Sequence, residues 1–553
     1  MADVGMHEQI ERWLAADPDP ATRAELAAIV EADDQAELAD RFSTRLAFGT
    51  AGIRGEQGAG PNRMNRVTVR RMVGGIARYL GPGRTVVIGH DARHNSSVFA
   101  RDAADVLAGS GIRAVLIGGH VPTPVLAHAV PLHRADLGLM VTASHNPPAD
   151  NGCKVFLADG AQLRSPVDAQ IEAAIEALPL PERELPEPTT PPVEVPGAEV
   201  IESYVSAIAA VVPVPDGAAV RAAYTPLHGV GRPVFEAVFE AAGLPVPVSV
   251  ASQADPDPDF PTVAFPNPEE PGAMDAVVAL AQERGCHLAI ANDPDADRLA
   301  VSVPLADGSW RTLTGDEVGA LILDVVLDAT SGPDRKVVST VVCSSLVETM
   351  ARAHGLHHRA TLTGFKWIMA EAYADPELTP ILAYEESLGY AATPVVRDKD
   401  GMSAALWFVQ LTGALLARGV SPAERLDELA VEHGLHVTRS ASVRFDGAGG
   451  VGLAGAAVDA LRERPPTAVA GRRVLDVFDF ANGAELPPTN LLRLRLDGGI
   501  RVLVRPSGTE PKTKLYLEQV VPVDDVAVVE AERQVAGAVL DEITTAMEQI
   551  LGD

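Results

Sequence analysis

Cysteine is scarce in this sequence, with only Cys153, Cys286 and Cys343 among 553 residues. The number is odd and the three are far apart, so the pattern predicts neither a disulfide framework nor a cysteine-ligated zinc site. Long hydrophobic runs are lacking as well. No window of about 18 apolar, uncharged residues could span a membrane, and the polar N-terminal segment has no apolar signal region. These absences favour a soluble protein of a reducing compartment, the cytoplasm, with no membrane partner.

Basic residues are few relative to acidic ones. The chain has 45 Lys and Arg against 75 Asp and Glu, which gives a formal net charge of −30 at pH 7. A nucleic-acid binder neutralises backbone phosphates with Lys and Arg, so this balance argues against a nucleic-acid partner. An anionic small molecule would need a local basic patch that works against the overall field. Hydrophobic residues make up 47% of the chain, which is enough for large cores.

Short β-branched runs alternate with Ala- and Leu-rich stretches along most of the chain. We predict buried parallel strands at 85–91, 113–119 and 136–144, and a helix at 97–111 that ends at a glycine. The alternation returns with strands inside 220–229, 287–298, 336–345 and 380–390. This rhythm is typical of βαβ units, so we predict an α/β fold with mostly parallel sheets.

The length suggests about four domains of roughly 150 residues each. We expect boundaries in the proline-rich, acidic stretch 178–197, a stiff linker or exposed loop, and near 305–317, where a turn precedes a new helix. From about 433 onward, alternating strands at 436–445, 491–506 and 512–520 precede a long helix, as in a small α+β domain. The expected domains are 1–199, 200–313, 314–432 and 433–553.

Polar clusters directly follow several predicted strands, at the sheet edge where ligands gather in open parallel sheets. The first is TASHNPP at 142–148, in which Ser144 ends a strand. A serine there can act as a nucleophile if it is activated and flanked by cations, but Ser, Asn and Pro are also ordinary turn residues. A hydrolase triad is less attractive, because the adjacent side chains of Ser144 and His145 would point to opposite faces of an extended backbone.

The second cluster is NDPDADR at 292–298, in which Asp293, Asp295 and Asp297 are spaced by two residues. Three such carboxylates on one loop can converge on a hard cation such as Mg²⁺, or they can form an acidic turn. An EF-hand loop is excluded, because Arg298 and Pro304 stand where that loop needs glycine and glutamate.

A second acidic triplet, Asp255, Asp257 and Asp259, has the same spacing. Prolines frame it and no predicted strand leads into it. We therefore interpret this copy as a solvated loop rather than a metal site.

The segment RPSGTEPK at 505–512 lies between two strands of the last predicted domain. Its Arg, Ser, Thr and Gly can form a phosphate cradle, although a plain hairpin loop uses the same residue types. Four other segments supply glycines, cations or acceptors for sugar hydroxyls, and each is also compatible with an ordinary loop: GTAGIRG at 49–55, TLTGFK at 361–366, YEESLG at 384–389 and RDKDG at 397–401. The first of them fits neither the dinucleotide nor the P-loop pattern, which weakens the case for a nucleotide.

Taken together, these segments resemble the α-D-phosphohexomutase superfamily, which includes phosphoglucomutases and phosphomannomutases. GTAGIRG, TASHNPPADNGCKVF, NDPDADR, EESLG and RPSGTEPK occur in the family's order. The resemblance implies four domains around a central cleft, three related α/β domains with mixed or parallel sheets and a C-terminal α+β domain. It also implies an intramolecular phosphotransferase that interconverts a sugar 1-phosphate and 6-phosphate, with glucose as the first choice, through a phosphoserine and a bisphosphorylated sugar.

The resemblance carries over roles residue by residue. It implies that Mg²⁺ is held by Asp293, Asp295, Asp297 and a phosphate oxygen on Ser144. The catalytic positions that match the family are Ser144, His145, Lys154, Arg54 and Arg298. The substrate-binding positions that match are Thr363, Gly364, Lys366, Glu385, Ser387, Lys399, Arg505, Ser507, Gly508 and Thr509.

Two features depart from the commoner bacterial pattern. DPDADR and TGFKW are similar to the longer branch that also contains phosphopentomutases, and Tyr390 stands where another branch has a histidine. A phosphomannomutase or phosphopentomutase is therefore the alternative. A phosphosugar phosphatase would have no obvious use for 505–512, and a carbohydrate-binding protein would not need three converging aspartates. The expected partner is a small phosphorylated sugar, with the sugar 1,6-bisphosphate as activator or intermediate, and the protein is expected to be a monomer or homodimer.

Overall fold

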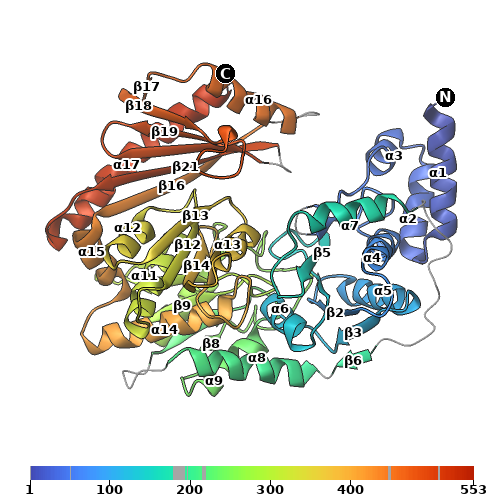
Figure 1. Ribbon diagram of the computed structural model, residues 1–553, viewed down its shortest axis with the longest axis horizontal. Coiled ribbons are helices and arrows are strands. Elements are labelled where there is room, and N and C mark those ends of the chain that lie inside the picture. Colours follow the sequence, from blue (N-terminus) through green and yellow to red (C-terminus); the bar gives the residue numbers. More distant parts are fainter. Residues whose placement is uncertain are drawn as a thin grey trace. The chain divides into compact units, whose positions relative to one another are not determined.

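The computed structural model describes residues 2–49, 52–178, 193–195, 197–213, 220–445, 450–507 and 511–552 (Figure 1). The chain divides into two compact units. Unit 1 comprises Met1–Leu313 and Ser387–Gly413, and unit 2 comprises Thr314–Glu386 and Ala414–Asp553.

Unit 1 contains a six-stranded mixed sheet with the strand order β1-β5-β4-β2-β3-β6. Strands β2, β3, β4 and β6 run parallel, whereas β5 pairs antiparallel with both β1 and β4. The strands are β1 (Gly52–Glu56), β2 (Thr85–His90), β3 (Arg113–Ile117), β4 (Leu137–Val141), β5 (Asp150–Leu157) and β6 (Val193–Val195). The predicted parallel strands are confirmed, but Val193–Val195 is an edge strand rather than part of a linker, and 179–192 lie outside the described residues.

Helices cover both faces of this sheet, which is why the central strand β4 is apolar at every position. The helices are α4 (Arg66–Leu80), α5 (Ser96–Gly109), α6 (Thr123–Leu132) and α7 (Val167–Glu176). In β4, Leu137, Leu139 and Val141 join the core with α4 and α5. On the opposite face Gly138 leaves room for α6, because a Cβ there would lie 2.4 Å from a methyl carbon of Val130. The alternation of β4 side chains thus packs one helical layer on each side.

Three helices precede the sheet: α1 (Ala2–Ala16), α2 (Pro20–Glu31) and α3 (Gln35–Phe42). Asp19 caps α2 and Asp34 caps α3, each by accepting a backbone N–H of the first turn. The three helices share a small core in which Trp13 contacts Phe42 edge to face. The sequence indicated only a polar N-terminal segment here.

A second sheet follows in unit 1, with the strand order β11-β10-β9-β7-β8. Its strands are β7 (Ala222–Thr225), β8 (Val248–Ser249), β9 (Leu288–Ala291), β10 (Ala300–Pro304) and β11 (Trp310–Thr312). Strands β7, β8 and β9 are parallel, as predicted, and β10 turns back antiparallel to β9. The accompanying helices are α8 (Gly197–Val211), α9 (Arg232–Ala241) and α10 (Asp275–Arg284).

Unit 2 begins at a capping box, in which Thr314 and Glu317 bond reciprocally to start α11 (Gly315–Ala329). Strand β12 (Arg335–Thr340) runs parallel to both β13 (His357–Thr361) and β14 (Thr379–Glu385). Helices α12 (Leu346–Ala353), α13 (Phe365–Ala372) and α15 (Pro422–His433) belong to the same part of the chain. Strand β15 (Gly389–Ala391) lies in unit 1. Helix α14 (Gly401–Ala417) belongs to unit 1 up to Gly413 and to unit 2 from Ala414 onward.

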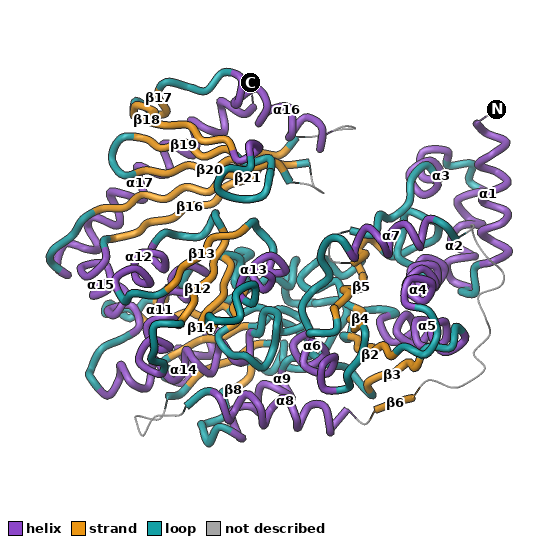
Figure 2. Tube along the Cα trace, in the orientation of Figure 1, coloured by secondary structure: helices purple, strands orange, loops and turns teal. Residues whose placement is uncertain are grey.

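The C-terminal part of unit 2 is a six-stranded antiparallel sheet with the order β16-β21-β20-β19-β18-β17 (Figure 2). Its strands are β16 (Leu435–Arg444), β17 (Ala468–Val469), β18 (Arg472–Asp479), β19 (Leu492–Leu496), β20 (Ile500–Pro506) and β21 (Lys512–Val521). The helices are α16 (Gly450–Glu463), the short 3₁₀ helix η1 (Phe480–Asn482) and α17 (Val526–Gly552). The predicted α+β segment with its long final helix is confirmed, and with it the fold class.

A buried carboxylate ties this sheet to the rest of unit 2. Glu518 on β21 accepts hydrogen bonds from Ser344 Oγ and Ser345 N–H, both at 2.7 Å. Burial alone would raise the pKa of Glu518, but the hydrogen bond with His436 and the charge of Arg501 lower it to about 2. The loop after β12 and strand β21 are therefore held together by a satisfied buried network.

Among the described residues, no single helix is long and apolar enough to cross a membrane. Helices α14 and α15 meet the length and composition requirement only when they are taken together as a bent pair.

Candidate active site

Ser144 lies three residues beyond β4, where the chain turns sharply. Its N–H donates to Thr142 Oγ1 at 2.8 Å, and its backbone is left-handed with φ of +52°. The side chain is only 3% exposed, and its hydroxyl donates to Asp293 Oδ2 at 2.8 Å. This conformation is strained for a residue other than glycine, and it persists only where the surrounding contacts hold it. The contacts of the loop therefore hold this serine in place.

The expectation that Ser144 and His145 point apart is wrong. His145 Nδ1 lies 3.2 Å from Ser144 Oγ, because the left-handed turn at Ser144 removes the alternation of an extended chain. On its other side, His145 Nε2 lies 3.4 Å from Nη2 of Arg298. Burial, reinforced by the charges of Arg298 and Arg54, lowers the pKa of His145 well below its ordinary value.

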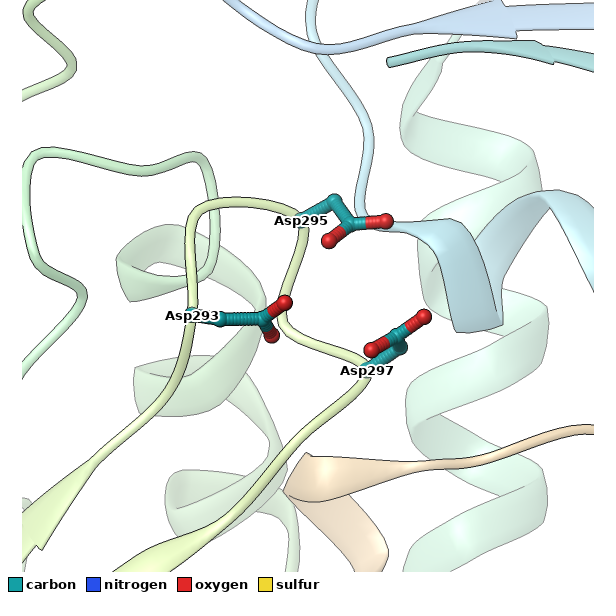
Figure 3. A group of neighbouring side chains, drawn as sticks. All are labelled: Asp293, Asp295 and Asp297. Atoms are coloured by element: carbon teal, nitrogen blue, oxygen red, sulfur yellow. The ribbon is translucent and has the colours of Figure 1, made fainter. Parts of the chain in front are cut away.

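The three aspartates of the loop after β9 converge. One carboxylate oxygen from each of Asp293, Asp295 and Asp297 lies within 4.8 Å of the others (Figure 3). All three side chains are essentially inaccessible to solvent. Asp293 Oδ1 accepts the N–H of Arg298 at 3.0 Å, which closes the loop on itself.

Two lysines approach this acidic cluster. Lys154 Nζ, on β5, lies 2.6 Å from Asp295 Oδ2 and 2.7 Å from Asp297 Oδ2. Lys399 Nζ lies 3.4 Å from the same oxygen of Asp297. Sequence reasoning assigned Lys399 only to substrate binding, whereas the fold of unit 1 also brings it to the aspartate loop.

The lysines divide the aspartates into two kinds. Burial would raise the pKa of Asp297, but Lys154 and Lys399 lower it below its usual range. The pKa of Asp295 is lowered in the same way by Lys154, against burial and the neighbouring Asp297. Burial and the two neighbouring carboxylates raise the pKa of Asp293 well above its ordinary value. At Asp293 the charges of Arg298 and Lys154 do not outweigh burial and the two neighbouring carboxylates.

The cluster suits a divalent cation. Asp295 Oδ1 and Asp297 Oδ1 are buried, and neither has a hydrogen-bond partner among the described residues. Buried acceptors without partners are costly, and a small hard cation bound by carboxylate oxygens would satisfy them. Such an ion would also offset the charge that makes Asp293 difficult to ionise.

Arg54 lies on β1, beside the loop that carries Ser144. Its Nη1 donates to Asn146 Oδ1 at 2.8 Å. Arg54 lies there because β1 packs closely against β5. The close approach requires a glycine at residue 52, whose φ is +129° and where a Cβ would lie 1.9 Å from the carbonyl oxygen of Cys153. Residues 50 and 51 of the same glycine-dense segment lie outside the described part of the chain.

The second acidic triplet behaves as predicted. Asp255 and Asp259 are exposed, and each pairs with a basic side chain: Arg232 Nη2 lies 2.6 Å from Asp255, and His94 Nε2 lies 2.8 Å from Asp259. Among the described residues, only Asp293, Asp295 and Asp297 form an acidic group with metal-binding spacing.

Unit 2 brings together part of the predicted substrate-binding set. Nη1 of Arg505, at the end of β20, donates to Thr363 Oγ1 in the loop before α13. Gly364 follows with φ of +111°, and Lys366 is buried with its Nζ 5.2 Å from the ring of Trp367. Two loops far apart in sequence therefore meet at Arg505.

The remaining predicted substrate residues are divided. Glu385 ends β14 in unit 2, whereas Ser387 begins the segment that belongs to unit 1. Ser507 N–H donates to the carbonyl oxygen of Lys512 at 2.8 Å, which joins the end of β20 to the start of β21. Gly508 and Thr509 lie outside the described residues. Their roles stay predictions.

Sequence reasoning missed two residues of the site in unit 1. Thr123 donates its hydroxyl to Asp295 Oδ2, and Arg93 donates to backbone carbonyls of the Ser144 loop. Arg93 follows β2 in the polar stretch HDARHN, so the rule that drew attention to Ser144 could have found it. Thr123 follows a proline at a helix start and carried no comparable pattern.

Three domains of one known protein family match successive parts of the chain. They are phosphoglucomutase/phosphomannomutase alpha/beta/alpha domain I at residues 45–181, domain II at 202–306 and domain III at 314–432. A probable phosphomannomutase from Haemophilus influenzae is 40% identical over 463 residues, which cover 82% of this chain and 93% of that protein. The chain belongs to the phosphoglucomutase/phosphomannomutase family. It is a phosphosugar mutase of the α-D-phosphohexomutase superfamily, as the motifs indicated.

Other relatives carry different substrate names. A probable phosphoribomutase from Schizosaccharomyces pombe is 34% identical, and the alignment covers 93% of both chains. A phosphoglucomutase from Staphylococcus epidermidis is also 34% identical, over 87% of this chain and 92% of that one. The crystal structure of a putative phosphomannomutase from Thermus thermophilus superposes with a TM-score of 0.67 at 24% identity, covering 90% of this chain and 99% of that one, and has the same fold.

Proposed function

We propose that this mutase interconverts glucose 1-phosphate and glucose 6-phosphate through a phosphoserine at residue 144 and a glucose 1,6-bisphosphate intermediate. The observation that carries the proposal is the geometry around Ser144. Its hydroxyl lies 2.8 Å from Asp293 Oδ2, in a buried group of three aspartates that two lysines approach. A serine so placed can carry a phosphoryl group whose oxygens face cations on several sides.

The cofactor in this proposal is Mg²⁺. Asp293, Asp295 and Asp297 would hold it together with a phosphate oxygen on Ser144, and the buried acceptors described above support that assignment. When bound, the ion supplies positive charge to the phosphoryl oxygens.

In the first half-reaction the bond between Ser144 Oγ and phosphorus breaks, and a bond from phosphorus to a sugar hydroxyl oxygen forms. The hydroxyl's proton passes to a base, and the leaving serine oxygen is protonated in turn. His145 Nδ1 and Lys154 Nζ are the two candidate bases, at 3.2 Å from Ser144 Oγ and at 2.6 Å from Asp295. The positive charges of Arg54 and Arg298 stabilise the negative charge on the phosphoryl oxygens during transfer.

The second half-reaction runs this sequence in reverse after the bisphosphate has turned end for end. A phosphate that is not reacting therefore has to be held in both halves. We assign that task to Arg505, with Thr363, Lys366, Ser507, Gly508 and Thr509. The guanidinium of Arg505 donates a hydrogen bond to the hydroxyl of Thr363 in another loop. A phosphate bound there could accept hydrogen bonds from both the guanidinium and that hydroxyl.

Contacts with the sugar hydroxyls are assigned to Glu385, Ser387 and Lys399. Water has to be excluded from the reacting phosphoryl group, because phosphate-monoester hydrolysis competes with transfer.

Ribose 1-phosphate and ribose 5-phosphate form the second candidate substrate pair. This second candidate is supported by relatives named phosphoribomutase and phosphopentomutase, which align with 93% and 94% of this chain. The phosphoglucomutase relative aligns with 87% and the phosphomannomutase relative with 82%. A mannose phosphate is the third.

A substrate panel tests the proposal. Purified enzyme with Mg²⁺ and a trace of glucose 1,6-bisphosphate would be given the 1-phosphates of glucose, mannose and ribose in turn, and product would be followed by phosphorus NMR. We expect the highest kcat/KM with glucose 1-phosphate and negligible release of inorganic phosphate. A higher kcat/KM for ribose 1-phosphate would transfer the assignment to the pentose, and stoichiometric phosphate release would refute a mutase.

The proposal extends to the protein's setting. We place it in the cytoplasm as a monomer or homodimer, with a small phosphorylated sugar as its partner and neither nucleic acid nor a membrane. The support is the acidic composition and the three free, buried cysteines. Size-exclusion chromatography with light scattering would distinguish monomer from dimer.

A further inference from the structure

One buried arginine organises the backbone of the loop that carries Ser144. The side chain of Arg93 donates four hydrogen bonds to main-chain carbonyls: to Ser144 at 2.6 Å, Asn146 at 2.5 Å, Pro147 at 2.8 Å and Asp150 at 3.1 Å. The residue is only 4% exposed. A single guanidinium thus binds carbonyls at both ends of the turn between β4 and β5.

A cationic donor with several N–H groups suits this set of carbonyls, of which Pro147 O also accepts the backbone N–H of Asp150 at 3.1 Å. Four carbonyl oxygens gathered at one place repel one another, and buried carbonyls without donors are costly. The planar guanidinium presents several N–H groups in a fixed fork, which lets it serve separate acceptors at once. By binding the carbonyl of Ser144, Arg93 holds that residue in its left-handed conformation, with Oγ toward Asp293.

Two neighbouring side chains, those of Asp91 and Phe260, contact Arg93. Its Nε lies 3.6 Å from Asp91 Oδ2, and its own N–H donates to Asp91 Oδ1 at 3.0 Å. On the other side the ring of Phe260 covers the guanidinium, with its centroid 4.9 Å from the central carbon. The neighbouring residue His94 pairs with Asp259 at 2.8 Å. The loop with the second acidic triplet, which binds no metal in our assignment, therefore closes over Arg93.

We propose that Arg93 is a positioning residue for phosphoryl transfer, fixing Ser144 through its carbonyl oxygen without touching the substrate. The proposal rests on Ser144 as the phosphorylated residue. It predicts that loss of the guanidinium misplaces Oγ relative to the aspartate loop. A misplacement of about 1 Å can lower a rate about 100-fold.

The primary test is Arg93→Lys. A lysine keeps the charge, but its single ammonium cannot span the carbonyls of Ser144 and Asp150 together. We expect kcat to fall roughly 10- to 100-fold, with KM for glucose 1-phosphate within about threefold of wild type. We also expect phosphorylation of Ser144 by added glucose 1,6-bisphosphate, followed by intact mass, to slow by a similar factor.

Arg93→Ala is the second variant, because it opens a space that free guanidinium can enter. We expect about 100-fold loss of kcat or more, and partial recovery of kcat in millimolar guanidinium, below denaturing concentrations. If this variant does not fold, the Arg93→Lys result decides alone.

Arg41→Lys is the matched control. Arg41 is also buried, donates to a backbone carbonyl (Ala59 O at 2.9 Å) and pairs with two glutamates, but it lies among the N-terminal helices. We expect its kcat to stay within about twofold of wild type. An equal loss of kcat in Arg41→Lys, or an unchanged kcat in Arg93→Lys, would overturn the positioning role. A loss expressed mainly in KM would make Arg93 a substrate contact instead.

The result is separable from the proposed function. A wild-type protein that never carries phosphate on Ser144 refutes the function itself. A wild type that is phosphorylated, beside an Arg93→Lys variant phosphorylated equally fast, refutes only the inference about Arg93.

Discussion

Replacement of Asp295 by asparagine tests whether the buried acidic cluster is a metal site. The change removes one negative charge while keeping an oxygen that can still accept hydrogen bonds from Lys154 and Thr123. The fold should therefore survive. The affinity for Mg²⁺ should fall, because a neutral amide oxygen is a weaker ligand for a hard cation than a carboxylate.

The size of the effect follows from the environment of Asp295. The side chain is fully buried, so water does not screen the lost charge. A contact with a charged group contributes about 1.5–3 kcal/mol. At about 1.4 kcal/mol per factor of ten, the Kd for Mg²⁺ should rise between about 10- and 100-fold.

Equilibrium unfolding in denaturant, with and without Mg²⁺, measures this without any turnover. At a Mg²⁺ concentration 100 times the wild-type Kd, the ion should stabilise the wild type by about 2.7 kcal/mol. At the same concentration the gain for Asp295→Asn should be about 1.4 kcal/mol for a tenfold weaker site and about 0.4 kcal/mol for a 100-fold weaker one. Titration calorimetry should give the same Kd values.

The control is Asp257→Asn in the second acidic triplet. The metal-binding group contains no residue of that triplet, so this variant should keep the full Mg²⁺-dependent gain in stability. If both variants lose the gain equally, our choice between the triplets is wrong. If neither loses it, Mg²⁺ binds elsewhere.

Three further outcomes are expected. Ser144→Ala should abolish turnover with little change in melting temperature, and wild type but not variant should show one phosphate of about 80 Da by intact mass spectrometry; an active variant would refute the phosphoserine. Arg505→Ala should lower kcat/KM by about one to three orders of magnitude, because charge-assisted hydrogen bonds to phosphate are lost, and an unchanged kcat/KM would reduce the loop to an ordinary hairpin. Burial raises the pKa of Asp316 to about 7, so the folded state keeps a proton that the unfolded chain loses near pH 4. Unfolding free energy should therefore fall by up to about 4 kcal/mol as pH rises from 4 through 7; Asp316→Asn should remove that dependence and Asp328→Asn, on the exposed side of the same helix, should not.

Much of the fold was readable from local patterns. The strands at 85–91, 113–119 and 136–144 were predictable because β-branched runs buried on both faces leave few alternatives. The start of α11 was predicted from the turn near 305–317, and the end of α5 from a nearby glycine. The short edge strand Val193–Val195 was not readable, because three residues in a proline-rich stretch carry no periodicity.

The candidate site divides along the same line. Ser144 and the aspartates Asp293, Asp295 and Asp297 were predictable as candidates because each segment follows the carboxyl end of a strand, where ligands gather in parallel sheets. That they meet was not predictable, because β4 and β9 belong to two different sheets. The direction of the His145 side chain was predicted wrongly. It depends on the left-handed turn at Ser144, which Arg93 and the neighbouring backbone impose from outside the motif.

From residue types and spacing alone follow the α/β class, the acidic loop as a possible cation site and the candidate nucleophilic serine, whereas the family was indicated by the resemblance of the motifs. These features are encoded over short stretches, where hydrophobic periodicity and turn chemistry act locally. Contacts between distant segments needed the folded chain. These contacts join residues that are 51 to 143 positions apart: Arg93 with Ser144, Lys399 with Asp297, Thr363 with Arg505, and Lys154 with Asp295 and Asp297. No local pattern encodes such pairs, because they form only when separate strands and helices pack into common cores.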